Sequence, residues 1–160
     1  MGAGILPLAS YKGKLYFLFS RETKEIDYKD SGLWSDFGGG SNKGENFFDT
    51  AVREGWEESM GIMGTQKDIK YILNNYTIDT IEINGYKTYL VMMQYNKDII
   101  KRFDDCYKKA VKDNKDKIGK NGLYEKDKIK WIGVGDLRKN IKMFRPFYKK
   151  IVYELIKIFK

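Results

Sequence analysis

The chain has 160 residues, of which 42% are apolar and 15% aromatic, enough for one domain with a substantial core. It contains no histidine and a single cysteine, Cys106. Histidine-based triads, histidine metal sites and disulfides within the chain are therefore excluded. The chemistry must rest on carboxylates, lysines, tyrosines or a bound metal ion, and we expect Cys106 to be an ordinary half-buried residue.

The net charge of +8 is unevenly distributed along the chain. Residues 1–96 hold 10 Lys/Arg against 13 Asp/Glu, whereas residues 97–160 hold 20 against 9. An acidic part joined to a basic part suits a polyanionic substrate such as a nucleotide, an RNA end or an inositol phosphate. The alternative is that the lysines serve solubility alone. Without a long apolar run or a secretory leader, we expect a protein of the cytoplasm or nucleus that is not secreted.

The first third of the chain predicts strands that lead into a cluster of glycines. Alternating and apolar residues predict strands over 3–10 and 15–20. Residues 21–31 are polar and irregular, which is typical of a loop that borders a substrate pocket. A short strand is predicted over 33–37, directly before the glycines at 38–40.

Residues 46–59 predict a helix capped by Asn46 or Glu45, and its three glutamates share one face. Glu54, Glu57 and Glu58 stand at i, i+3 and i+4, so their carboxylates repel one another unless a cation lies between them. Oxygen ligands suit Mg²⁺ or Mn²⁺. The alternative is the solvated face of an amphipathic helix. The predicted inner stripe comprises Phe47, Phe48, Ala51, Val52 and Trp56.

The second half predicts a hairpin, a basic helix, a strand and a final helix. Asn84-Gly85 joins two β-rich runs, 69–83 and 86–95, and is the strongest short hairpin signal in the chain. A basic amphipathic helix is predicted over 98–117 and a strand over 126–134. Pro146 opens an amphipathic helix with apolar positions Phe147, Ile151, Leu155 and Ile158. This order predicts a single α/β domain over 1–160, with a mixed sheet between helices.

The glycine cluster and the glutamate helix together form a spaced motif that resembles the signature of the Nudix hydrolases. That signature reads G, five positions, E, seven positions, then R-E-aliphatic-x-E-E-x-G-aliphatic. The chain matches it between Gly39 and Ile62, with the residues Gly39, Glu45, Arg53, Glu54, Glu57 and Glu58.

Two positions of the motif depart from the signature. Gly55 replaces the aliphatic residue, and Met60 stands where a glycine is expected, with Gly61 one residue later. We expect Gly55 to permit close packing, because a glycine inside a helix otherwise costs about 1 kcal/mol. We expect the late Gly61 to cap the helix.

The resemblance implies a Nudix α/β/α sandwich and cleavage of a pyrophosphate linkage with Mg²⁺ or Mn²⁺. It implies that the metal is bound by Glu54, Glu57 and Glu58, with the backbone carbonyl of Gly38 as a further ligand. It assigns a structural role to Gly39, Glu45 and Arg53, with Arg53 tying the helix to the loop through Glu45 and pointing away from Glu54.

Some members of this family use a carboxylate from a late loop as general base. Glu125 is the best-placed candidate here, Glu57 is the alternative, and Glu58 completes the predicted catalytic carboxylates. The neighbouring Lys126 and Lys128 are predicted to contact phosphate. The tyrosines predicted to stack on a base are Tyr86 and Tyr89, although tyrosines in strands are more often simple β-formers.

The resemblance leaves the substrate open, because this family acts on several on one fold. The basic second half favours the 5′ cap of RNA, since RNA would follow the lysine-rich face. A nucleoside triphosphate, a dinucleoside polyphosphate, ADP-ribose or a diphosphoinositol polyphosphate are the alternatives. A different class is an inactive RNA- or nucleotide-binding module, which the glutamates argue against. Nothing in the sequence predicts a membrane or an obligate protein partner.

Overall fold

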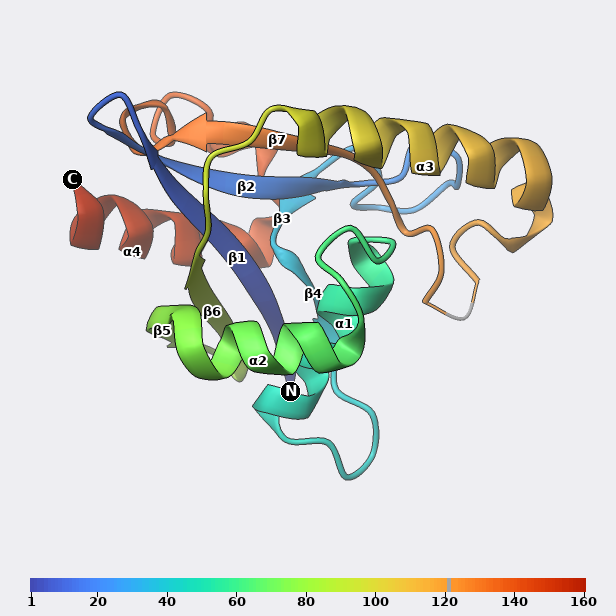
Figure 1. Cartoon of the computed structure of the whole chain (residues 1–160), viewed down its shortest axis with the longest axis horizontal. Helices are drawn as coiled ribbons and strands as arrows, with labels where there is room; N and C mark the ends of the chain where they lie inside the picture. The colour runs from blue at the N-terminus through green and yellow to red at the C-terminus, as the bar shows by residue number, and fades with distance from the viewer. Residues whose placement is uncertain (121) are drawn as a thin grey trace.

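The computed structural model describes residues 1–120 and 122–160, and in this part the chain forms a mixed sheet of seven strands with helices on both faces (Figure 1). The strands are β1 (Gly2–Tyr11), β2 (Lys14–Glu22), β3 (Trp34–Ser35), β4 (Phe37–Gly40), β5 (Thr77–Ile83), β6 (Tyr86–Met92) and β7 (Lys126–Gly133). The helices are α1 (Phe47–Glu58), α2 (Gln66–Tyr76), α3 (Asp98–Asn114) and α4 (Lys149–Phe159), and short 3₁₀ turns occupy Lys115–Lys117, Val134–Asp136, Ile141–Met143 and Pro146–Tyr148. No helix of the described residues is both long and apolar enough to cross a bilayer.

Strand β1 is the centre of the sheet. It pairs antiparallel with β2 and β4 and parallel with β6, while β5 extends the sheet beyond β6 and β7 pairs with β2. Side chains alternate across β1, so Ala3 and Ile5 face α1 and α2, whereas Leu6 and Leu8 face α4. Helix α3 lies along β7 on the same face as α1 and α2 (Figure 1). The predicted mixed sheet between helices is confirmed.

The hairpin and the glutamate helix form as predicted. Asn84 and Gly85 have φ of 52° and 77°, the left-handed conformations that a tight β-hairpin turn requires. Helix α1 begins after Asn46, whose side chain accepts a hydrogen bond of 2.7 Å from the N–H of Asp49. A Cβ on Gly55 would lie 2.6 Å from Cδ1 of Ile5, so this glycine lets α1 pack closely on β1, as expected.

The region 69–76 was predicted to begin a strand, and this prediction is wrong. Residues 66–76 form α2, which starts with a capping box between Thr65 and Asp68. Ile69 and Leu73 then stand one turn apart and are both buried against the sheet, which explains why a helix forms from residues that also favour strands.

Several smaller expectations are also corrected. The strand predicted over 33–37 divides at Asp36 into β3, which pairs with β2, and β4, which pairs with β1. Cys106 is exposed rather than half-buried. In the final helix Ile151 and Leu155 are buried as expected, but Ile158 is exposed in the last turn of α4, and Phe147 is exposed in the 3₁₀ turn that precedes α4.

The end of α1 differs from the expected cap by one residue. Met60, with φ of 52°, takes the left-handed position, and Gly61 follows with φ of 75°. The N–H of Met60 bonds to the carbonyl of Glu57, and the N–H of Gly61 to the carbonyl of Trp56. This is the Schellman arrangement. Met60 therefore occupies the conformation that the missing glycine of the motif would adopt.

Candidate active site

Strand β4 places glycine backbone directly against the carboxylates of α1. The N–H of Gly38 donates a hydrogen bond of 2.7 Å to Oε2 of Glu58. A Cβ on Gly38 would lie 2.5 Å from Cα of Gly4, and a Cβ on Gly39 would lie 2.7 Å from the carboxyl carbon of Glu54. Gly38 therefore requires glycine because a Cβ would meet backbone, whereas a Cβ on Gly39 would displace the carboxylate of Glu54.

Arg53 ties α1 to the preceding loop, as predicted. Its Nε and Nη2 each donate a 2.9 Å hydrogen bond to the carboxylate of Glu45, and Nη2 also bonds to the carbonyl of Gly40. The Arg53 guanidinium holds the pKa of Glu45 at about 2. The expectation that Arg53 points away from Glu54 is wrong, because its Nη1 lies 2.7 Å from Glu54 Oε1 and 3.2 Å from Glu57 Oε2.

Four carboxylates come together at the site. Glu54 and Glu58 are buried on α1, Glu57 is half-buried beside them, and Glu125 approaches from the loop before β7. Burial raises the pKa of Glu54, and burial with the charge of Glu54 raises the pKa values of Glu57 and Glu125. Burial also raises the pKa of Glu58 well above its usual range. The structure thus places Glu125 near the motif glutamates, and its role as general base stays a prediction.

A cavity of about 390 Å³ lies over this cluster. Glycine backbone forms one wall, and charged side chains, one tyrosine and one isoleucine form the others; the lining residues are Glu22, Ile26, Tyr28, Gly38, Gly39, Gly40, Glu58, Gly119, Glu125 and Arg145. Residues 22, 26 and 28 come from the segment 21–31, which was predicted to border a substrate pocket and does border this cavity.

Lys126 is not the exposed phosphate contact that the sequence predicted. It is only 1% exposed, and its Nζ lies 3.1 Å from Glu22 Oε1, 3.0 Å from Ser35 Oγ and 3.7 Å from Glu58 Oε2. Burial alone would lower the pKa of Lys126, but Glu58 and Glu22 together raise it above its ordinary value. Lys126 is therefore the buried cation that balances two site carboxylates.

Sequence reasoning missed Glu22 and Arg145. Nη1 of Arg145 lies 2.6 Å from Glu22 Oε1, and Nε lies 2.9 Å from Asp30 Oδ2. Both Glu22 and Arg145 line the acidic cavity. The two residues are 123 positions apart in the chain, so no local spacing could have joined them.

The remaining predicted substrate contacts lie elsewhere. Lys128 is exposed on β7 and is absent from the cavity wall. Oη of Tyr86 donates a 2.6 Å hydrogen bond to Oδ1 of the buried Asp36, and its ring packs against Phe147. Tyr89 packs against Phe48 of α1. Because both rings are packed within the protein and neither lines the cavity, the prediction that they stack on a substrate base is not supported by their positions.

The donor set fits a hard divalent cation in its chemistry. Every candidate ligand is a carboxylate or backbone oxygen. Burial raises the pKa values of Glu57 and Glu125, the charge of Glu54 raises them further, and a cation would relieve that repulsion. Within residues 1–120 and 122–160, however, no three Asp, Glu or Cys side chains already converge as a metal site. Glu54 and Glu57 are instead bonded to Arg53, and Glu58 to the backbone of Gly38. The role of the Gly38 carbonyl stays a prediction.

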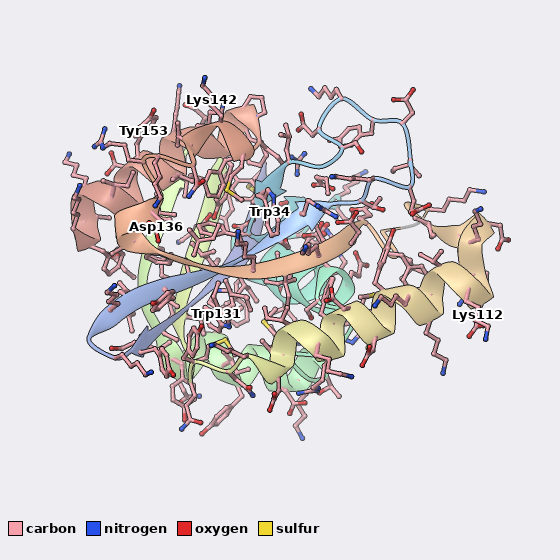
Figure 2. The ribbon with its side chains drawn as sticks, turned by 90° about the horizontal axis from the view of Figure 1, so that it is seen from above. Trp34, Lys112, Trp131, Asp136, Lys142 and Tyr153 are labelled. Atoms are coloured by element: carbon pink, nitrogen blue, oxygen red, sulfur yellow. The ribbon has the colours of Figure 1, made fainter. Side chains whose placement is uncertain are left out.

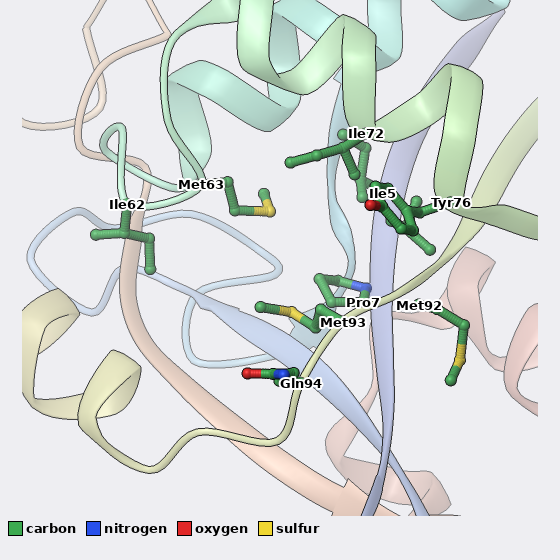
Figure 3. Close-up of a pocket in the computed structure, with 10 residues that line it drawn as sticks. Ile5, Pro7, Ile62, Met63, Ile72, Tyr76, Met92, Met93 and Gln94 are labelled. Atoms are coloured by element: carbon green, nitrogen blue, oxygen red, sulfur yellow. The ribbon is translucent and has the colours of Figure 1, made fainter.

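A separate cavity of about 590 Å³ is lined by apolar residues of α2, β1 and β6 and of the segments that follow α1 and β6 (Figure 3). Its wall carries no charged side chain, and it shares no lining residue with the acidic cavity. Although it is larger, it lacks the carboxylates that a hard cation prefers.

Sequence comparison provides a relative whose own function is not described. No family model matches the chain. Over 106 residues, or 66% of the chain, it is 34% identical to the uncharacterized protein L534 of Acanthamoeba polyphaga mimivirus. The matched region covers only 31% of that protein, so the chain corresponds to about a third of it.

Comparison with solved structures is more informative about the fold. A C. elegans Ap4A hydrolase in a binary complex is similar with a TM-score of 0.55 and 18% identity, over 98% of this chain and 94% of that one. The Nudix hydrolase RenU of M. smegmatis gives 0.55 and 14%, over 98% and 84%.

A bifunctional NMN adenylyltransferase/ADP ribose pyrophosphatase of Francisella tularensis, complexed with AMP and a Mn ion, gives a TM-score of 0.56 and 16% identity. That likeness covers 98% of this chain and 41% of the larger protein. Together with the sheet topology, these likenesses show that the chain has the fold of the Nudix hydrolases, as its glycine and glutamate motif predicted.

Proposed function

We propose that the chain is a Mg²⁺- or Mn²⁺-dependent pyrophosphohydrolase that cleaves a phosphoric anhydride in a nucleoside diphosphate derivative. The observation that carries this proposal is the meeting of Glu54, Glu57, Glu58 and Glu125 beside a cavity walled by glycine backbone. The fold adds support, because it is shared with proteins described as an Ap4A hydrolase and an ADP ribose pyrophosphatase.

Glu54, Glu57 and Glu58 would hold the metal, which would neutralise phosphate charge and make a bound water more acidic. The chain's own contacts already orient these groups. Gly38 fixes Glu58 through its N–H, and Arg53 fixes Glu54 and Glu57. Arg145 on the cavity wall would face the phosphate groups, and Glu22 and Asp30 hold its guanidinium in position.

Glu125 is the proposed general base, with Glu57 as the alternative. Glu125 lines the cavity, and the N–H of Thr23 donates a 2.8 Å hydrogen bond to its backbone carbonyl, which anchors the loop. The Glu125 carboxylate would take a proton as water attacks phosphorus and the bond to the leaving phosphate oxygen breaks. A carboxylate near the attacking water is required for this step, whichever anhydride is cleaved.

The first substrate that we propose is the 5′ cap of RNA. The support is charge: residues 97–160 carry a net +11, and α3 directs lysines such as Lys112 outward (Figure 2). These cations would follow the RNA backbone. A small nucleotide, such as a dinucleoside polyphosphate or ADP-ribose, is the second candidate, because the acidic cavity is only about 390 Å³. A diphosphoinositol polyphosphate is the third.

Hydrolysis of a substrate panel tests this proposal. Capped RNA, free cap dinucleotide, nucleoside triphosphates, Ap4A, ADP-ribose and a diphosphoinositol polyphosphate are each incubated with Mg²⁺ or Mn²⁺. We expect one class to be cleaved at the anhydride, and salt to inhibit the reaction steeply if that class is capped RNA. Binding of capped RNA without cleavage of any panel member would instead show a binding module of the same fold.

A further inference from the structure

Trp56 is the exposed tryptophan of the chain. It is 39% exposed, whereas Trp34 and Trp131, both labelled in Figure 2, are 7% and 9% exposed. It lies on α1 directly before Glu57, although its spacing predicted a place in the helix core. An exposed indole beside a cluster of site carboxylates leaves a large flat apolar surface open to a ligand.

Tyr124 stands directly before Glu125, in the segment that leads into β7. Its φ is 55°, in the left-handed region that bulky residues rarely adopt. Such conformations persist where the surrounding structure enforces them, and they are frequent at ligand sites. Each of these two aromatic residues thus precedes a site carboxylate by one position.

The two aromatic residues line one cavity of about 200 Å³. Its wall is mainly apolar and comprises Trp56, Glu57, Met60, Gly61, Leu123 and Tyr124. Glu57 connects this cavity to the carboxylate cluster, since it also bonds to Arg53 at 3.2 Å. The cavity is smaller than the roughly 300–1,000 Å³ of sites that enclose whole drug-sized ligands, so it suits one planar ring.

We propose that this cavity binds the base of a nucleotide, with Trp56 and Tyr124 providing the stacking surfaces. The inference rests on the proposed function, because the carboxylate cluster beside the cavity is where the phosphates of that nucleotide would lie. Stacking accepts any base, since every base has a π face, so the site selects for the presence of a base more than for its identity. The site therefore favours base-bearing substrates over diphosphoinositol polyphosphates.

Calorimetric titration with AMP and with ribose 5-phosphate, both in Mg²⁺, tests the proposal. The two probes share a phosphate and differ in the base, and neither contains an anhydride to hydrolyse. We expect AMP to bind about tenfold more tightly or better, and to quench tryptophan emission where ribose 5-phosphate does not. Equal affinities, or no binding of AMP, would overturn the proposal.

Variants assign the difference to the cavity. Trp56→Ala should abolish the preference for AMP, while Trp56→Phe should keep it. Tyr124→Gly, which removes the ring and accommodates a φ of 55°, should weaken AMP without unfolding the loop. Tyr153→Ala, at an exposed tyrosine of α4 (Figure 2), is the matched control and should change nothing. A preference for AMP that survives in Trp56→Ala would place the base elsewhere.

The outcomes separate this inference from the proposed function. If the preference for AMP depends on Trp56 but no anhydride is cleaved, the base site stands and the hydrolase proposal fails. If an anhydride is cleaved and AMP shows no advantage over ribose 5-phosphate, the hydrolase proposal stands and the base site fails.

Discussion

Lys126 provides a sharp test of how the acidic site is held together, because sequence and structure assign it opposite roles. As an exposed phosphate contact, it could be replaced without loss of stability. In the structure it is buried between Glu22, Glu58 and Ser35, so Lys126→Met would leave two buried carboxylates with less positive charge. The variant should therefore be destabilised before any substrate is added.

The size of this effect follows from the remaining contacts. Removing one partner of a buried ion pair typically costs about 3–5 kcal/mol. Glu22 keeps Arg145 at 2.6 Å, which places the expected loss at the lower end, about 3 kcal/mol. For a chain of this length, that corresponds to a fall in Tm of roughly 6–12 °C.

The loss should also depend on pH. In the folded protein burial raises the pKa of Glu58, so its protonated form is favoured by folding. Without Lys126 this pKa rises further, and the cost is present above the raised pKa and is relieved as the pH falls through it. Urea denaturation should therefore show a larger loss for Lys126→Met at pH 8 than at pH 5.

Lys128→Met is the matched control, since Lys128 is exposed two residues further along β7. It should change the free energy of unfolding by no more than about 0.5 kcal/mol. If Lys126→Met behaved like this control, and instead only raised KM, the buried network would be refuted and the phosphate-contact interpretation restored.

Three further predictions follow from the site. Gly38→Ala should destabilise the fold by more than about 1 kcal/mol, because a Cβ would lie 2.5 Å from Cα of Gly4. Gly40→Ala should be nearly neutral, because a Cβ there meets nothing within 4 Å. Chemical denaturation compares the free energies of unfolding of the two variants. Burial raises the pKa of Asp36 to about 6, so the charge of this carboxylate opposes folding above that pH. The stability of Asp36→Asn relative to the parent should therefore increase by about 1.5 kcal/mol as the pH rises from 5 to 8. A stability difference that is independent of pH would contradict this. Saturating Mg²⁺, at about 100 times its Kd, should stabilise the parent by about 2.7 kcal/mol in thermal melts. Glu58→Gln should lose most of this gain in stability. An equal gain in both proteins would show that the ion binds elsewhere.

The glutamate helix and the hairpin could be predicted because their signals are local. Glu54, Glu57 and Glu58 are grouped by helical geometry alone, and Asn84-Gly85 specifies its own turn. Helix α2 was missed because Ile69 and Ile72 also favour strands. The signal that would have found it was the capping box of Thr65 and Asp68.

The buried network around the site could not be predicted from spacing. Glu22 and Lys126 are 104 residues apart and meet because β2 pairs with β7. A register shift beyond Arg21 brings Lys126 opposite Glu22. Such a shift depends on the pairing of two strands, so no pattern within either segment reveals it. The solvent exposure of Trp56 likewise depends on how α1 rotates to bury Glu54 and Glu58 against β4.

The most direct test of the central claim measures Mn²⁺ binding and anhydride hydrolysis on the same samples of the parent, Glu58→Gln and Glu82→Gln. Glu82 is exposed on β5 and serves as the matched control. The proposed site predicts that Glu58→Gln stays folded, binds Mn²⁺ more weakly and loses turnover by about a hundredfold or more, while Glu82→Gln resembles the parent. Full turnover in Glu58→Gln, or hydrolysis that persists in excess chelator, would contradict the assignment of the acidic cavity as the catalytic metal site.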